Sequence, residues 1–207
     1  ILFTTSTNLL TLKAGSSVSG GSDSSFVSGP VKKIGNTGFQ FPVGKVSMYF
    51  PLSISSPAIA TDAFTCEYFD ANQSYGTSIA GSLHGISDCD HWVLTRNSGS
   101  SDVHVTLYWT NGSCHSLDTN DVRVASFYSG IWNNEGNGDN GTFNNKNYVK
   151  TVNTQANYTA YALAYVQGGN SCQSSFSLAS NLLCTDSLFK TTNKETWYSF
   201  HSDSLRL

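Results

Sequence analysis

An apolar side chain at every second position is the feature that most restricts how this chain can fold. Residues 102–109 show it best, because Val103, Val105, Leu107 and Trp109 would share one face of a strand. No segment repeats its apolar residues with helical spacing over ten or more positions. Further strands are predicted at 46–54, 63–69, 91–96, 121–128, 148–153, 159–166 and 174–179.

Short loops rich in Gly, Asn and Ser separate these predicted strands. Many short strands with regularly spaced turns are typical of a β-sandwich. The sequence therefore predicts an all-β protein, an antiparallel β-sandwich with additional terminal strands. An open barrel is the alternative arrangement of the same strands.

The polar residues of the chain are mostly uncharged. Only 12% of the 207 residues are charged, about half of the usual fraction, and the formal net charge is −3. This composition excludes coiled coils, and 39% hydrophobic residues are enough to build a core. The charge balance leaves no basic surface for nucleic acid. No apolar run approaches the ~20 residues of a membrane span, so membrane insertion is not expected either.

The cysteines allow two disulfides and leave one thiol over. We expect residues 91–96 and 102–109 to form a hairpin around a turn at 97–101. This pairing would place Cys89 and Cys114 near the same end of the hairpin, where a disulfide is geometrically reasonable.

Cys172 with Cys184 is the next predicted pair, which leaves Cys66 as a buried thiol. The high content of Ser, Thr and Asn, together with four Asn-x-Ser/Thr triplets that begin at Asn72, Asn111, Asn140 and Asn157, fits an extracellular setting.

The two ends of the chain differ from its middle. We predict an N-terminal strand segment at 1–28, a sandwich domain at 29–180, and a C-terminal strand or linker at 181–207. The last of these would be the start of another domain or a donor strand. Both ends carry apolar residues that would insert into a neighbouring sheet. Charged side chains normally prevent an edge strand from pairing with another chain, and this sequence has few of them. The predicted assembly residues are Leu2, Leu10, Leu12, Trp197, Phe200 and Leu205. The alternative is that both ends pack on their own domain.

The middle of the chain resembles a known family. The segments SFVSGPVKKIGN at 25–36 and FQFPVG at 39–44 resemble a signature of large surface and adhesin-like proteins. Gliding-type bacteria export these proteins through the type IX secretion system. Further matching segments, in the same order, are EYF at 67–69, ISDC at 86–89, WVLTR at 92–96, DVRVA at 121–125, WNNEGN at 132–137 and SFSLAS at 175–180.

This resemblance covers about residues 8–180 and implies a non-catalytic, secreted β-module at the cell surface. Neighbouring domains of a larger protein, or other copies of the chain, would be its partners. Three Asp-Ser segments also resemble the O-glycosylation sequon of these bacteria, which makes Ser24, Ser187 and Ser204 the predicted glycan sites.

The residues themselves indicate no catalytic site and no cofactor. A nucleophilic triad needs Ser, His and a carboxylate held together, and the sequence has no Gly-x-Ser-x-Gly elbow that would mark one. Residues 134–141 offer part of a calcium loop through Glu135, Asn137 and Asp139, but the full ligand pattern is missing. A hairpin loop is the stronger interpretation of this segment.

Sugar binding would use an exposed aromatic ring on the β-scaffold. Trp92, Trp109, Tyr108 and Tyr128 are available, but packing explains such residues equally well. Trp132, beside an Asn-rich loop, is the predicted exposed ligand residue. Our main prediction is an extracellular structural or adhesive module that assembles into a fibre by exchanging terminal strands. The alternative is a carbohydrate-binding module of a polysaccharide-degrading system.

Overall fold

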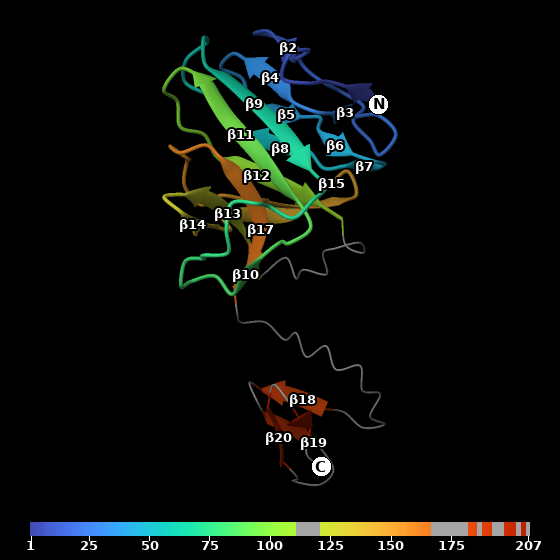
Figure 1. Ribbon diagram of the computed structural model, residues 1–207, viewed down its shortest axis with the longest axis vertical. Coiled ribbons are helices and arrows are strands. Elements are labelled where there is room, and N and C mark those ends of the chain that lie inside the picture. Colours follow the sequence, from blue (N-terminus) through green and yellow to red (C-terminus); the bar gives the residue numbers. More distant parts are fainter. Residues whose placement is uncertain (111–120, 167–181, 186–187, 192–196, 202–203, 206–207) are drawn as a thin grey trace. The chain divides into compact units, whose positions relative to one another are not determined.

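The computed structural model describes residues 1–110, 121–166, 182–185, 188–191, 197–201 and 204–205. The chain divides into two compact units, Ile1–Gln167 and Gly168–Leu207, each of which is described here by itself. The described residues contain no α-helix. The protein is therefore all-β, as the alternation of apolar residues predicted (Figure 1).

The first layer of unit Ile1–Gln167 is an eight-stranded sheet. Its neighbouring strands are antiparallel, except that β2 runs parallel to β4. The strands in spatial order are β14 (Ile131–Gly136), β13 (Val122–Tyr128), β17 (Ala160–Tyr165), β11 (His91–Ser98), β9 (Ala63–Phe69), β4 (Val31–Ile34) and β2 (Leu10–Leu12), with β10 (Gly85–Ile86) also paired to β17.

The second layer is a five-stranded antiparallel sheet. Its strands in order are β15 (Asp139–Phe143), β16 (Lys146–Lys150), β12 (Val105–Trp109), β8 (Leu52–Ile54) and β5 (Phe39–Phe41). Two small ribbons complete the unit: β1 (Leu2–Phe3) lies parallel to β3 (Val27–Ser28), and β6 (Gly44–Lys45) pairs with β7 (Met48–Tyr49).

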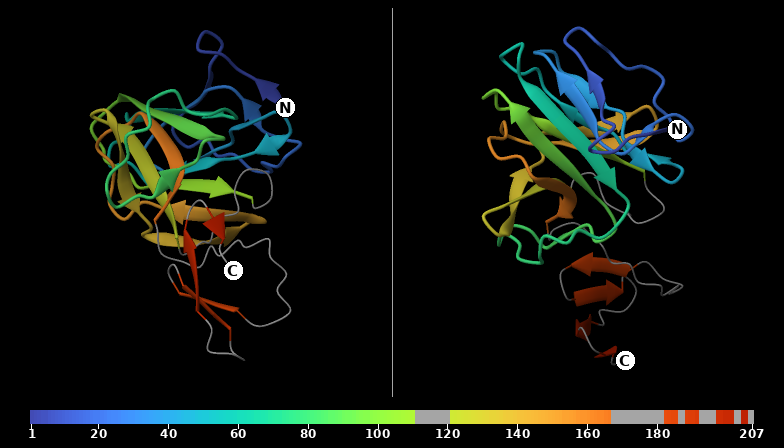
Figure 2. Two further views of the ribbon diagram at one scale, coloured as in Figure 1. Left: turned by 60° about the horizontal axis from the view of Figure 1, so that its bottom comes forward. Right: turned by 45° about the horizontal axis from the view of Figure 1, so that its top comes forward.

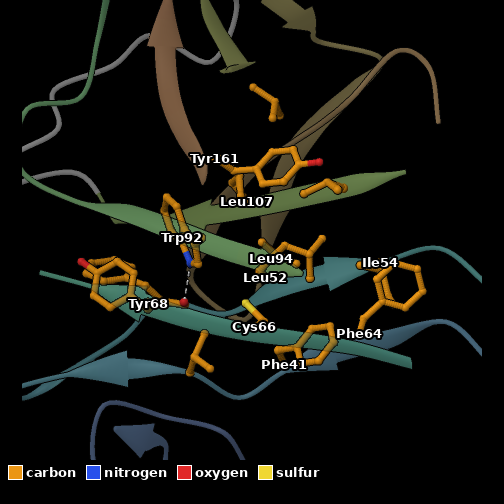
Figure 3. Close-up of a cluster of buried hydrophobic side chains, with 14 of the residues drawn as sticks. Phe41, Leu52, Ile54, Phe64, Cys66, Tyr68, Trp92, Leu94, Leu107 and Tyr161 are labelled. Atoms are coloured by element: carbon orange, nitrogen blue, oxygen red, sulfur yellow. Dashed lines mark hydrogen bonds between the residues drawn. The ribbon is translucent and has the colours of Figure 1, made fainter. Parts of the chain in front are cut away.

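The main core lies between the two sheets, which makes this unit a β-sandwich. Trp92 and Leu94 of β11 meet Leu52 of β8 and Leu107 of β12, and all four side chains are fully buried. Trp92 Nε1 donates a hydrogen bond to the Phe50 carbonyl at 2.9 Å, drawn dashed in Figure 3. Because this bond satisfies the one polar atom of the indole, the ring is buried without an unpaired donor.

A second, smaller core lies on the other face of the eight-stranded sheet. The three alanines of β17, Ala160, Ala162 and Ala164, face away from the main core and pack with Leu83 and Trp132. Backbone hydrogen bonds hold residues 78–87 along β14 and β17. This segment therefore covers a sheet face that would otherwise be open to solvent, and small alanine side chains leave room for it.

The predicted hairpin of residues 91–109 is wrong. β11 pairs with β9 and β17 in the eight-stranded sheet, whereas β12 pairs with β8 and β16 in the five-stranded sheet. The segment between them crosses from one sheet to the other, with Gly99 at φ +87°. Arg96 Nη1 stabilises this crossover segment by donating hydrogen bonds to the Ser101 carbonyl at 2.9 Å and to Asp102 Oδ1 at 3.0 Å.

The N-terminal strands belong to the first unit. β1 and β2 (dark blue in Figures 1 and 2) each add to a strand of the same unit, so residues 1–28 form no separate segment in the fold. The compact unit ends at Gln167, whereas the sequence-based boundary is 180. The predicted strand at 174–179 lies outside the described residues.

The second unit contains a four-stranded antiparallel sheet in chain order. Its strands are β18 (Leu182–Thr185), β19 (Leu188–Thr191), β20 (Trp197–His201) and β21 (Ser204–Leu205).

Candidate functional site

The outer face of the five-stranded sheet carries polar and aromatic side chains in rows across the strands. Because Leu52, Leu107 and Val149 point into the core, their neighbours along each strand point outward. One row comprises Gln40, Ser53, Thr106, Lys150 and Asp139, and the next contains Tyr108, Tyr148 and Gly141.

A hollow of about 410 Å³ opens at this face. Its wall comes from five places in the chain: the loop at 21–23, strand β5, strand β7 with the residues that follow it, the end of β12, and the turn between β15 and β16. The volume lies in the range of small-molecule binding sites in proteins. Residues far apart in the sequence thus form one concave surface, which we take as the candidate functional site.

Tyr49 is the buried aromatic residue of the hollow. Its hydroxyl donates to Gln40 Oε1 at 3.3 Å, and Gly21 lies so close that a Cβ there would overlap the Tyr49 ring. Burial, and to a lesser degree the neighbouring Tyr108, raises the pKa of Tyr49 to about 12. The hydroxyl therefore stays protonated at ordinary pH and remains a hydrogen-bond donor.

Asp23 and Lys146 form an ion pair at the edge of the hollow, with 3.2 Å between Nζ and Oδ1. The same Oδ1 accepts a hydrogen bond from the backbone N–H of Tyr49 at 2.8 Å. The Lys146 ammonium also lies 5.1 Å from the centre of the Phe50 ring, within reach of a cation–π interaction. These contacts hold the loop at 21–23 against the sheet.

The rings of Tyr108 and Tyr148 extend the aromatic surface beside the hollow. Their centres are 6.0 Å apart, and the Tyr108 hydroxyl accepts a hydrogen bond from Ser53 Oγ. Gly141 pairs across the strands with Tyr148, and a Cβ on this glycine would come within 3.1 Å of the ring. A larger residue at 141 would therefore push the Tyr148 ring out of its place.

The turn between β15 and β16 supplies the outer rim. Asn144 and Asn145 have φ values of 48° and 60°, the left-handed region that two-residue hairpin turns require and that Asn tolerates. Phe143 precedes them with 52% of its surface exposed, and all three residues line the hollow. The rim thus presents one exposed ring and two amides to a ligand.

Trp132 is not part of this surface, and its predicted exposure is wrong. The side chain is fully buried in the second core, with Nε1 donating to the Gly76 carbonyl at 3.0 Å. Residues 76–87, which cover it, are distant in sequence, so the Asn-rich neighbourhood gave a misleading signal.

The three predicted calcium ligands are engaged with protein groups. Glu135 accepts hydrogen bonds from Ser126 Oγ and Gln155 Nε2. Asn137 Nδ2 donates to the Val122 carbonyl at 3.1 Å, and Asp139 Oδ2 lies 3.9 Å from Lys150 Nζ. Nowhere in residues 1–110 and 121–166, nor in the described strands beyond them, do three or more His, Cys, Asp or Glu gather as a metal site. The segment also connects β14 and β15, which belong to different sheets, so it is a crossover and not a hairpin loop.

The predicted disulfides are only partly within the described chain. Cys89 precedes β11 and is half-buried, while Cys114 and Cys172 lie outside the described residues. Cys184 belongs to β18. Both pairings therefore stay predictions. Cys66 is a free thiol in the main core, as expected, and its pKa lies well above the usual value because of burial.

The predicted assembly residues lie on paired strands of both units. Leu2 pairs in register with Val27, and Leu10 with Val31. Leu12 is also on β2, Trp197 and Phe200 are on β20, and Leu205 is on β21 opposite Phe200. Of the predicted glycan sites, Ser24 is exposed beside the hollow, Ser204 is on β21, and Ser187 lies outside the described residues.

Sequence reasoning missed most residues of the hollow, among them Asp23, Gln40, Tyr49, Phe143 and Lys146. The Asn144–Asn145 pair is the one signal that could have indicated a tight hairpin there. Nothing in the sequence links the loop at 21–23 to that hairpin.

No family model, no curated protein and no solved structure matches this chain. The described residues also contain no helix of the length and apolar character that crossing a membrane requires.

Proposed function

We propose that this chain is a non-catalytic adhesive module of an exported surface protein, and that it attaches to a polysaccharide through the hollow of the five-stranded sheet. The observation that carries the proposal is the composition of that hollow. An exposed ring, tyrosine hydroxyls, side-chain amides and a carboxylate converge on one concave surface of about 410 Å³.

Sugars suit such a surface for two reasons. Their C–H faces stack on aromatic rings, and Phe143 and Tyr108 offer such rings at the rim and wall. Their hydroxyl groups need both donors and acceptors, which amides and tyrosines supply together. The low overall charge agrees with a ligand held by neutral polar groups. The resemblance of residues 25–44 to surface modules supports an extracellular location.

The test is a binding measurement between the purified chain and a panel of polysaccharides, by pull-down and isothermal titration calorimetry. Phe143→Ala removes the exposed rim ring and should weaken binding roughly tenfold. Tyr128→Ala is the matched control, because Tyr128 is 39% exposed on the other sheet. Absence of binding to every polysaccharide, or equal losses in both variants, would refute the proposal.

Fibre assembly through the terminal strands is a second candidate, which one observation favours. β1 is held by a pairing of only two residues, and it exposes 50% of Leu2 and 76% of Phe3. A strand held so weakly in its own sheet can exchange with that of another copy. Deleting residues 1–12 should abolish oligomers or filaments seen by size-exclusion chromatography and electron microscopy. A chain that is monomeric at every concentration would exclude this candidate.

A further inference from the structure

We propose that the hollow selects a neutral, hydroxyl-rich sugar and rejects acidic sugars, with Asp23 as the acceptor that binds the ligand's hydroxyls. This inference rests on the proposed function and adds the class of sugar to it. It follows from the unequal exposure of the two charged groups in the hollow.

The hollow holds one carboxylate and one ammonium, so its net charge is close to zero. The two groups are not equally accessible, however. The side chain of Asp23 is 63% exposed, whereas that of Lys146 is only 10% exposed. A ligand entering from solvent therefore meets the negative group first.

Lys146 is already satisfied within the protein. Its Nζ lies 3.2 Å from Asp23 Oδ1 and 5.1 Å and 5.8 Å from the centres of the Phe50 and Tyr49 rings. An acidic ligand could reach this ammonium only by displacing Asp23, which would break the bond between Oδ1 and the Tyr49 N–H. The lysine thus orients the carboxylate instead of serving as an anion site.

Asp23 retains capacity to accept further hydrogen bonds. In the described part of the chain both protein bonds to its carboxylate end on Oδ1. The two bonds to Oδ1 restrain the group, and because 63% of the side chain is exposed, a ligand can approach Oδ2 from solvent. A carboxylate oxygen accepts strong, charge-assisted hydrogen bonds from hydroxyl groups.

Repulsion excludes acidic sugars from the same place. A uronic acid residue would set its own carboxylate beside the exposed Asp23, and like charges at close range disfavour binding. The remaining rim groups, the amides of Asn144 and Asn145, carry no charge that could offset this repulsion. The charges of the hollow therefore discriminate between neutral and acidic chains.

The test compares neutral oligosaccharides with uronic acid oligosaccharides of the same length, by calorimetry at low salt. Asp23→Asn keeps the Oδ1 acceptor for Tyr49 and Lys146 but removes the charge. We expect it to weaken binding of the neutral series by about 10- to 100-fold. The matched control is Asp139→Asn, since Asp139 faces Lys150 on the same sheet but lies outside the hollow. This control should leave the affinity unchanged.

The possible results distinguish failure of this inference from failure of the proposed function. Tighter or equal binding of the acidic series, or full affinity in Asp23→Asn, overturns the inference while leaving sugar binding itself intact. Failure of both series to bind the unmodified chain overturns the proposed function together with this inference. A thermal melt of each variant shows that the fold is kept, so a loss of affinity reports on the site.

Discussion

Replacing Trp132 with alanine separates a packing role from a binding role. The side chain has no exposed surface and fills the second core against Ala125, Ala160 and Ala162. Truncating a buried Trp to Ala costs about 3–5 kcal/mol, because apolar burial is lost and a cavity remains. Losing the hydrogen bond from Trp132 Nε1 to the Gly76 carbonyl adds little to this cost. Gly76 is exposed, so water can donate to its carbonyl in place of the indole.

For a unit of this size, each kcal/mol lowers the melting temperature by about 2–4 °C. The expected decrease for Trp132→Ala is therefore roughly 6–20 °C. Urea denaturation followed by circular dichroism measures the free energy directly, and differential scanning calorimetry measures the temperature. Phe143→Ala is the control, because its exposed ring should change the stability by no more than about 0.5 kcal/mol.

Two results would refute this reasoning. A melting temperature within about 2 °C of the unmodified chain would mean that Trp132 is not packed as described. A folded, stable Trp132→Ala variant that loses polysaccharide binding would restore Trp132 as a ligand residue and remove the hollow from that role.

Three further predictions concern buried groups. Burial raises the pKa of the Cys66 thiol. This thiol should therefore not react with Ellman's reagent at pH 8 in the native protein, and it should react fully in denaturant. Rapid labelling of Cys66 in the native protein would contradict its burial. The raised pKa of Tyr49, about 12 against an ordinary value of 10, implies stability that is complete below pH 10 and is lost as the pH rises toward 12. Urea midpoints across that range should fall less in Tyr49→Phe, and an identical decline in both proteins would argue against this role. Asp62 is fully buried, and neither of its carboxylate oxygens has a hydrogen-bond partner among the described residues, so Asp62→Asn should raise the free energy of unfolding by about 1 kcal/mol or more. A destabilised Asp62→Asn variant would mean that the carboxylate has a stabilising partner.

Several strands could be predicted because their signal is local. Residues 63–69 alternate in the sequence, and β9 spans those same residues with Phe64, Cys66 and Tyr68 buried. The alternation at 102–109 likewise predicted which side chains of β12 are buried, Val105, Leu107 and Trp109 among them. A side chain's face depends only on its position along its own strand, so the sequence contains this information.

Strand pairing is not local, and there the sequence was misleading. β11 and β12 carry the same alternation because both face one core, from opposite sheets. Alternation shows that a side chain is buried, but it does not show which sheet the strand joins. The error in the 91–109 hairpin has this cause.

By itself the sequence determined that the chain is all-β, where several of its strands lie and which residues of those strands face the core, since these properties follow from neighbouring residues. Only the tertiary structure decided which aromatic side chains are exposed and which distant residues come together in one site. It buried Trp132 beneath residues 76–87, and it brought Asp23 and Lys146, which are 123 residues apart, into one ion pair. Such contacts depend on how the two sheets and their loops fold over one another, and no short window of sequence contains that information.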